Sequence, residues 1–340
     1  MRSYKPYIIK LCIVFLCFWG WILTGSAQKV GTNDYFYVLN TQQGLSDNCI
    51  LQMIQLADGR LAVRTRKGIN LYNGRRFTFI PLPAEKAESI TKYKGQTHLY
   101  ADSQDRLWVK EYQKIFCILL SEGRLQEHSL DSLPGNGKEN KMRIIPNTPT
   151  GNAIQDLFVD SRKNVWVVMG DSLLNTQDGN LIHLKKEWGY LQDLDTDGKQ
   201  VYAFMDSGIV AVFQKDKLVY AASAYSTAEA QHYRNTSLTI QTLSGQFYQI
   251  RTGRGEKNKA DASIFLHFNP ETRKFARIFA CDYILHTLNM SSDNQALISS
   301  QHGYLMFDFK LGTTPRALHS AKPACCRYQS AASPEHRAAM

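Results

Sequence analysis

The sequence predicts an all-β fold, a β-propeller built from four-stranded antiparallel blades. Three observations predict it. Short apolar runs alternate with turn dipeptides along the body of the chain, a bulky residue returns at one place in this repeat, and the body contains no long amphipathic helix. With 44% hydrophobic and 21% charged residues, the composition is that of an ordinary folded protein.

Residues 1–27 predict a secretory signal peptide. Three basic residues precede an apolar run over residues 11–23, and the small residues Gly25 and Ala27 give a cleavage site after Ala27. The alternative is an uncleaved membrane anchor, for which the apolar stretch is only marginally long enough, since a span needs roughly 20 residues. We therefore expect a periplasmic chain, anchored at the inner membrane only if the signal is not cleaved.

The formal net charge of +10 is concentrated at the two ends of the chain. Residues 1–27 carry +3 and residues 310–340 carry +4, which leaves only +3 on residues 28–309. A nucleic-acid surface would need a basic patch on the folded body. No nucleic-acid partner is expected.

Cysteine does not organise the predicted fold. Of the seven cysteines, only Cys49, Cys117 and Cys281 lie in the body, at separations that match no metal-ligand spacing. Isolated buried thiols are favoured over one disulfide, which an oxidising compartment would permit. Neither a metal nor a cofactor is expected.

The clearest repeat unit spans residues 48–79. Apolar strands are expected around residues 50–54, 61–63, 69–72 and 77–80, with Asp58-Gly59 and Asn73-Gly74 between two of the pairs. Asp-Gly and Asn-Gly accept the positive φ of tight hairpin turns, so they are strong hairpin signals. Four short antiparallel strands in about 35 residues make one propeller blade.

Weaker copies of this unit follow along the chain. The position after the first apolar residue of the second strand is spaced by 36 to 58 residues from copy to copy, and it is occupied by Ala62, Trp108, Trp166, Tyr202, Tyr248 and Leu297. A bulky side chain at this place would fill the wedge between neighbouring blades. The alternative is that Trp108 and Trp166 form a platform for stacking sugars.

The residues singled out as structural repeat positions are turn glycines, turn aspartates and the aromatic residues of the strands. They are Gly44, Asp58, Gly59, Gly68, Tyr72, Gly74, Asp105, Trp108, Trp166, Gly198, Tyr202, Gly245, Tyr248 and Gly303.

The propeller is expected to span residues 28–309 with about six recognisable blades. A further strand at residues 35–39 either closes the ring against the last blade, or the ring lacks a blade. From residue 310 to 340 the strand alternation stops, and Ala, Ser, Pro, His and basic residues predominate. We expect this tail to be disordered or non-native sequence.

The first repeat resembles the regulator-propeller repeats of bacterial hybrid two-component sensors. The resemblance rests on Gly44-Leu45-Ser46-Asp47-Asn48, Asp58-Gly59-Arg60-Leu61, Gly68-Ile69-Asn70-Leu71-Tyr72-Asn73-Gly74 and Phe77, with Tyr35-Phe36-Tyr37 before them. It covers roughly residues 30–310 and weakens in the fourth to sixth units.

The resemblance implies the periplasmic part of a receptor that often senses glycan fragments. Its implied partners are a small-molecule or oligosaccharide ligand and a second propeller or a second copy of the chain. The kinase and receiver parts of such receptors are absent from the sequence, so the chain is expected to be a truncated member or a separate propeller. The alternatives are a stand-alone protein-interaction propeller and a propeller lyase or hydrolase.

The usual catalytic motifs are absent from the sequence: there is no nucleophile elbow, no zinc-binding His pair and no phosphate-binding loop. We therefore expect no enzyme and assign no catalytic residue. The stretch from Arg251 to Gly255 is interpreted as a basic hairpin loop rather than a phosphate cradle. Asp102 and Asp105, and the run from Asp193 to Asp197, are interpreted as turn residues that bond to their own backbone.

Overall fold

The computed structural model describes residues 39–93, 95, 97–133, 154–225, 239–243, 246–253, 262–290, 295–300, 303–309 and 316–318. The expected signal peptide, the strand expected at 35–39 apart from its last residue, and most of the expected tail lie outside these residues. The chain divides into Met1–Leu39 and Asn40–Met340, and the second unit is described here.

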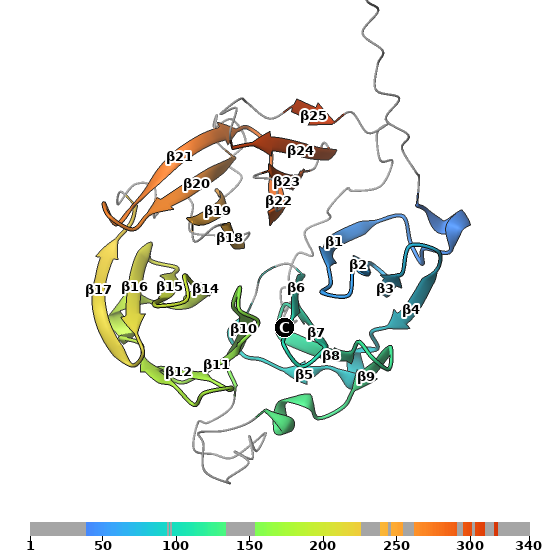
Figure 1. The fold of residues 1–340 in the computed structure, drawn as a ribbon, viewed down its shortest axis with the longest axis horizontal. Helices are drawn as coiled ribbons and strands as arrows, with labels where there is room; N and C mark the ends of the chain where they lie inside the picture. The colour runs from blue at the N-terminus through green and yellow to red at the C-terminus, as the bar shows by residue number, and fades with distance from the viewer. Residues whose placement is uncertain are drawn as a thin grey trace, which may run out of the picture. The chain divides into compact units, whose positions relative to one another are not determined.

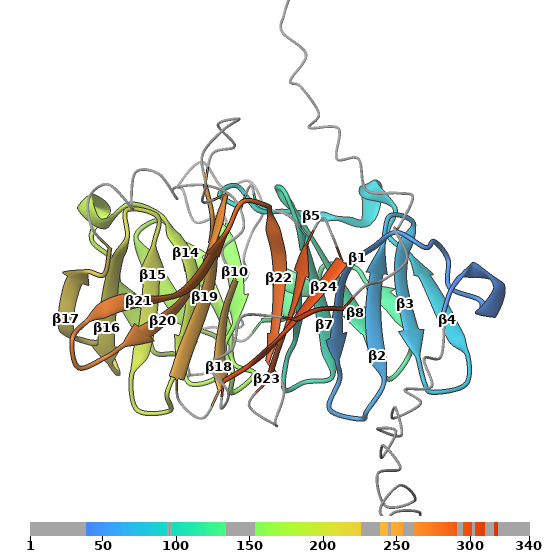
Figure 2. The ribbon, with the colours of Figure 1, turned by 90° about the horizontal axis from the view of Figure 1, so that it is seen from above.

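The second unit is a β-propeller of six antiparallel sheets, numbered as blades 1 to 6 along the chain (Figures 1 and 2). Blade 1 holds β1 (Ile50–Gln55), β2 (Leu61–Thr65), β3 (Gly68–Tyr72) and β4 (Phe77–Pro81). Blade 2 holds β5 (Glu88–Ser89), β6 (His98–Ala101), β7 (Arg106–Glu111), β8 (Lys114–Leu119) and β9 (Arg124–Gln126). Blade 3 holds β10 (Asp156–Val159), β11 (Val165–Met169), β12 (Ser172–Asn175) and β13 (Leu181–His183).

Blade 4 holds β14 (Leu191–Thr196), β15 (Val201–Met205), β16 (Ile209–Gln214) and β17 (Lys217–Ser223). Blade 5 holds β18 (Thr239–Leu243), β19 (Gln246–Thr252), β20 (Ser263–Asn269) and β21 (Lys274–Cys281). Blade 6 holds β22 (Leu285–Met290), β23 (Gln295–Ser300), β24 (Gly303–Asp308) and β25 (Arg316–Leu318). The described residues also form four 3₁₀ turns: η1 (Thr41–Gln43), η2 (Ala84–Lys86), η3 (Ser129–Ser132) and η4 (Lys186–Trp188).

The prediction of about six four-stranded blades is confirmed. Blade 2 has one strand more, because β5 and β9 both pair with β8. Strand β25 pairs with β24 and completes blade 6, although its residues lie in the range predicted as tail. Backbone pairing of this kind needs no apolar alternation, so the side-chain pattern did not reveal the strand.

The first strand of each blade lies toward the centre of the ring, where the strands of blade 2 are counted from β6 because β5 pairs with β8 on the outer side. These inner strands contact one another in chain order, from β1 through β6, β10, β14 and β18 to β22 (Figure 1). We call the face that carries the hairpins between second and third strands the upper face. The antiparallel order places the connections between successive blades on this same face. The hairpins between first and second strands lie on the opposite, lower face.

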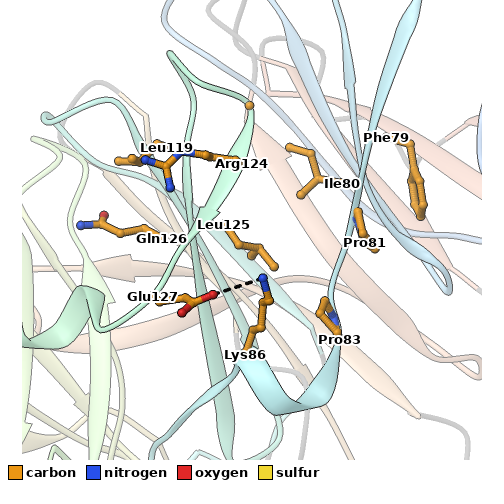
Figure 3. Close-up of a pocket in the computed structure, with 11 residues that line it drawn as sticks. Phe79, Ile80, Pro81, Pro83, Lys86, Leu119, Arg124, Leu125, Gln126 and Glu127 are labelled. Carbon is orange, nitrogen blue, oxygen red and sulfur yellow. Dashed lines mark ion pairs between the residues drawn. The ribbon is translucent and has the colours of Figure 1, made fainter.

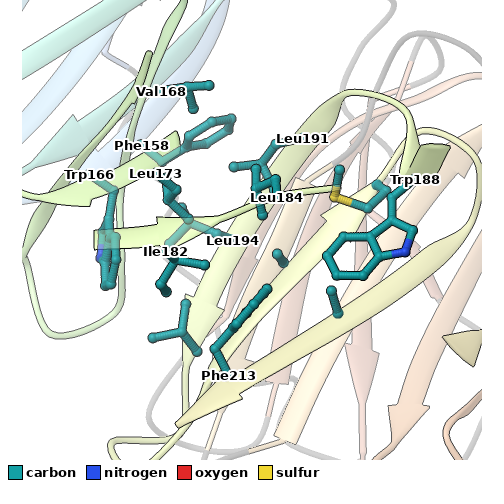
Figure 4. Packing of buried hydrophobic residues seen from close by; sticks show 14 residues of the cluster. Phe158, Trp166, Val168, Leu173, Ile182, Leu184, Trp188, Leu191, Leu194 and Phe213 are labelled. Atoms are coloured by element: carbon teal, nitrogen blue, oxygen red, sulfur yellow. The ribbon is translucent and has the colours of Figure 1, made fainter. Parts of the chain in front are cut away.

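Apolar side chains fill the junctions between successive blades, which we call seams and name by the two blades they join. Separate buried clusters occupy seams 1/2, 2/3, 3/4, 4/5 and 5/6. Figure 4 shows the cluster of seam 3/4, where Trp166 and Phe158 of blade 3 pack toward Leu194 and Phe213 of blade 4. Blades 2 to 5 are therefore each held by clusters on both sides.

The tryptophans of blades 2 and 3 are locked by the turn that precedes them. The Asp102 carboxylate accepts hydrogen bonds from the backbone N–H groups of Gln104 and Arg106, and its second oxygen accepts the Trp108 indole N–H at 2.7 Å. In blade 3, Asp160 accepts the Trp166 indole N–H at 2.9 Å. One aspartate thus orders the hairpin and positions the wedge residue.

The third turn residue after this aspartate adopts a left-handed backbone. Asp105 has φ of 59° and Lys163 has φ of 65°, and Gly59 takes this place in blade 1 with φ of 85°. Glycine adopts this conformation without steric cost, whereas other residues do so rarely. The repeat is therefore preserved in backbone geometry where its Asp-Gly signature has been lost.

Two predictions made for turns hold only in part. Asp197 lies in a turn and accepts the backbone N–H groups of Lys199 and Gln200, as expected, but other residues of these stretches lie in strands. Asp193 and Asp195 lie in the inner strand β14 and are buried, and Asp195 accepts the backbone N–H of Ser161 in blade 3 at 2.8 Å. Arg251 lies in β19 with only 1% of its surface exposed, not in a hairpin loop. Asp193 and Asp195 belong to an inner strand near the axis, and Arg251 belongs to the upper end of a second strand, so ladder pairing rather than local turn preference decides their structure.

Candidate functional site

A pocket of about 540 Å³ opens on the upper face at seam 3/4. Its walls are the connection between blades 3 and 4 and the hairpins at residues 170–171 and 206–207, with Lys92 from blade 2. Leu184 and Leu191 belong both to this pocket and to the seam cluster beneath it. Its volume lies within the usual range for small-molecule sites, roughly 300–1,000 Å³.

Tyr190 is the exposed aromatic side chain of this pocket, with 59% of its surface accessible. The Lys92 ammonium lies 4.4 Å from the centre of the Tyr190 ring, within cation–π range. The ring thus offers an apolar face flanked by a charged hydrogen-bond donor.

A glycine and an aspartate hold Tyr190 in place. The Asp206 carboxylate accepts the Tyr190 backbone N–H at 2.9 Å, and the Asp206 backbone N–H donates to the Tyr190 carbonyl at 2.9 Å. Gly189 has φ of 88°, and a β-carbon there would lie 2.0 Å from the Asp206 carboxylate. The wall of the pocket therefore requires glycine beside the tyrosine.

The floor of the pocket includes Asp156, which belongs to a buried ion pair near the axis. The Lys110 ammonium lies 2.9 Å from the Asp156 carboxylate and donates to the Leu157 carbonyl at 2.9 Å. The rings of Phe158 and Tyr93 lie 3.9 and 4.2 Å from the same ammonium. Burial lowers the pKa of Lys110 and raises that of Asp156, while their mutual attraction opposes both shifts.

Seam 1/2 carries a related ion pair at the upper ends of its strands. Arg64 in β2 pairs with Glu111 in β7, and Glu111 also accepts the Thr97 hydroxyl at 3.1 Å. Seams 1/2 and 2/3 are therefore each bridged by a cation from the upper end of a second strand.

His98 lies close enough to Lys110 to feel its charge. His98 is itself buried, and its ring lies 4.2 Å from that of Tyr100. Burial, and secondarily the charge of Lys110, lowers the pKa of His98 to about 3. The folded protein therefore keeps His98 neutral at pH values where the unfolded chain protonates it.

We expect His98 to make folding stability depend on pH. Because the folded pKa lies below the unfolded value of about 6.5, the unfolded state binds more protons between these values, and stability is lost as pH falls below 6.5 at up to about 1.4 kcal/mol per pH unit. His98→Gln should remove this part of the slope. Urea unfolding of both proteins at pH 7 and pH 5 measures it, and equal slopes would contradict the assignment.

Two further hollows lie away from the axis. The larger, about 710 Å³, is a groove on the outer rim of blades 1 and 2, lined by Phe79, Pro81 and Leu125 and by the Lys86–Glu127 ion pair (Figure 3). A hollow of about 400 Å³ lies on the lower face at seam 3/4 and includes the edge of Trp166. Trp166 itself is 2% exposed, which leaves no accessible ring for stacking sugars.

The repeat positions predicted from the sequence lie in hairpins and strands rather than around the upper pocket. Gly44 ends η1, Asp58, Gly59 and Gly198 lie in lower-face turns, and Gly74 lies in the turn before β4. Gly68 begins β3, Tyr72 ends it beside Phe77, and Gly303 begins β24. Trp108, Trp166, Tyr202 and Tyr248 face seams 2/3, 3/4, 4/5 and 5/6 in that order, while Gly245 lies outside the described residues.

Sequence reasoning missed the residues of the upper pocket. The usable signals were a lone lysine in the apolar run Leu107-Trp108-Val109-Lys110 and the Gly189-Tyr190 pair in a connection between blades. A charged residue inside an otherwise apolar strand is costly unless it is paired, so it marks a position with a specific partner.

Within the described residues, no group of three or more His, Cys, Asp or Glu side chains is placed to hold a metal ion. None of Cys49, Cys117 and Cys281 forms a disulfide. Burial raises the pKa of Cys117 to about 12.

No helix of the described part of the chain is long and apolar enough to span a membrane.

The fold and the seams define the chain as a β-propeller. No known family profile matches the chain, and no curated protein matches it. Among solved structures it is similar to PorZ, a surface component of the type-IX secretion system of Porphyromonas gingivalis, with 12% identity and a TM-score of 0.50 over 83% of this chain and 34% of PorZ.

It is also similar to the extracellular domain of BT4673 from B. thetaiotaomicron, described as a candidate hybrid two-component system, with 15% identity and a TM-score of 0.46 over 80% of this chain and 35% of that one. A candidate 6-phosphogluconolactonase from Bacteroides fragilis matches with 14% identity and a TM-score of 0.44 over 78% and 81% of the two chains. The chain spans about a third of the length of the first two structures. At these identities the likeness shows the propeller fold alone.

Proposed function

We propose that this chain is the ligand-sensing portion of an exported two-component regulator, located in the periplasm, and that it binds a saccharide in the upper-face pocket. The observation that carries the proposal is the exposed Tyr190 ring, whose backbone is bonded on both sides to Asp206 and which has the Lys92 ammonium over one face. A sugar presents an apolar face of C–H groups and a rim of hydroxyls. Such a ligand matches an aromatic face surrounded by charged donors and acceptors.

Two further features support this proposal. The first repeat resembles the periplasmic propellers of two-component sensors, which implies a receptor. The pocket lies at a seam and is walled by segments of three blades, so a ligand there would contact several blades at once. The likeness to solved structures supports the fold on which this proposal rests.

We expect Tyr190→Ala to weaken saccharide binding about tenfold, equal to ~1.4 kcal/mol, because the stacking surface is removed while the loop clamp remains. Thermal-shift titrations of the full chain with a panel of neutral oligosaccharides measure the effect for any sugar that stabilises the wild type.

Phe79→Ala is the matched control, since it removes an aromatic side chain 44% exposed in the outer groove. It should leave the sugar response unchanged. If no oligosaccharide stabilises the folded wild type, or if Tyr190→Ala responds like the wild type, saccharide sensing at this pocket is refuted.

The outer groove favours a second candidate function, a platform for protein interaction. It is the larger hollow, and its wall is the edge strand β4, where Phe79 is exposed and Pro81 ends the strand. An edge strand that presents an aromatic side chain is a common site for another chain to pack. Loss of a partner in Phe79→Ala, with sugar binding intact, would assign function to this groove.

A further inference from the structure

Arg251 is a buried cation at the upper end of β19, the second strand of blade 5. Only 1% of its surface is exposed, and its guanidinium lies 4.3 Å from the centre of the Tyr225 ring, which follows β17 of blade 4. Tyr225 belongs to the apolar cluster of seam 4/5. The guanidinium therefore lies inside the ring wall, between two blades.

Among the described residues, no acceptor binds this guanidinium. None of its three nitrogens makes a hydrogen bond, and no ion pair in the described residues includes it. The side-chain amide oxygen of Gln249, two residues before Arg251 in β19, accepts the Tyr225 hydroxyl. Arginine cannot lose its proton in a protein, so neutralisation does not relieve the cost of burial.

The second strands of blades 1 and 2 also carry a cation at the upper end, and each of these cations has the acceptor that Arg251 lacks in the described part of the chain. Arg64 in β2 has Glu111, and Lys110 in β7 has Asp156 and the Leu157 carbonyl. Arg251 occupies the same end of its strand and carries the same charge, but faces an aromatic ring instead of a carboxylate. A cation with five donors and no acceptor at this place is the complement of an oxyanion.

We propose that Arg251 anchors an anion-binding site at the upper end of seam 4/5, for a ligand that carries a carboxylate or a sulfate group. The planar guanidinium binds such groups through two parallel hydrogen bonds, and the Tyr225 ring fixes its plane from one side. The anion supplies the acceptor that blade 4 does not.

This site is distinct from the upper pocket, although both lie on blade 4. Neither Arg251 nor Tyr225 lines the upper pocket. The two sites are connected through the backbone, because the N–H of Ala224 donates to the Gly208 carbonyl at 2.9 Å and Gly208 follows the pocket residues Asp206 and Ser207. The inference goes beyond saccharide sensing and does not depend on it, since it rests on a different side chain and a different seam.

The test is a thermal-shift titration of the full chain in low-salt buffer with sodium sulfate, sodium glucuronate or neutral glucose, each compared with sodium chloride at equal ionic strength. We expect the wild type to gain about 3 °C or more from at least one oxyanion and nothing from glucose. Arg251→Met should lose this gain and should melt above the wild type in low-salt buffer, because an unpaired buried charge is removed.

Three variants serve as controls. Arg75→Met removes an exposed arginine of blade 1 and should respond like the wild type. Tyr190→Ala should also keep the oxyanion response, which separates this site from the upper pocket. If Arg251→Met does not fold, Arg251→Lys keeps the charge without the bidentate geometry and should show a weaker response.

The salt that raises the melting temperature of the wild type identifies the chemical class of the anion. A response to sulfate alone identifies a free or ester sulfate, and a response to glucuronate alone identifies an acidic sugar. Equal responses of wild type and Arg251→Met to every salt would overturn the proposal, because sulfate stabilises most proteins by exclusion from their surface.

Discussion

Asp156→Ala is expected to lower the free energy of unfolding by about 3–5 kcal/mol, because it leaves the Lys110 ammonium buried without its counter-charge. Lys110 is 1% exposed and keeps the Leu157 carbonyl and the surrounding aromatic rings as contacts, with the weaker attraction of the Asp193 carboxylate as its remaining counter-charge. Urea unfolding at pH 7, followed by tryptophan fluorescence, measures the loss.

The double variant Lys110→Met with Asp156→Leu is the control for this prediction. It removes both charges and fills their space with apolar side chains, so it should regain most of the stability lost in the single variant. If the double variant is less stable than Asp156→Ala, the cost arises from packing at seam 2/3 and not from an unpaired charge.

Trp108→Ala is expected to cost about 3–5 kcal/mol, because it empties the wedge of seam 2/3 and removes the indole donor from Asp102. Trp108 is fully buried, and Asp102 retains an ion pair with Arg106 at 2.7 Å. Calorimetry or urea unfolding of the full chain measures the loss.

Trp108→Phe separates the two contributions, since it keeps most of the apolar volume and loses only the N–H group. A loss of about 1–3 kcal/mol is expected for it. Tyr112→Ala, at a side chain 60% exposed in the same blade, is the matched control and should change stability by less than about 0.5 kcal/mol. A Trp108→Ala variant as stable as this control would contradict the wedge role.

The propeller fold was predictable because its signals are local and repeated. Asp58-Gly59 and Asn73-Gly74 mark hairpins through backbone chemistry alone, and the spacing of Trp108, Trp166 and Tyr202 follows from the size of a blade. The short strand β25 was not predictable, because its pairing with β24 depends on backbone groups and carries no apolar pattern.

The upper pocket was not predictable for a different reason. Tyr190, Lys92 and Asp156 come from three blades and are brought together only by ring geometry, which no local pattern encodes. Asp193 shows the same limit, because the run of aspartates that ends at Asp197-Gly198 was interpreted as a turn, while the structure buries Asp193 in β14 near Tyr100. Arg251 was interpreted as a loop residue because the stretch from Arg251 to Gly255 follows the strand-like Tyr248 to Ile250 and no helix comes after it.

The stacking of blades in chain order has a mechanical meaning. Because each buried cluster joins two neighbouring blades, mechanical coupling between distant blades passes through the seams in chain order. The upper pocket lies over the seam between blades 3 and 4, above the cluster of Trp166 and Phe213. A molecule bound there would contact the blades on both sides of this seam and would add to the contacts that join blades 1–3 to blades 4–6.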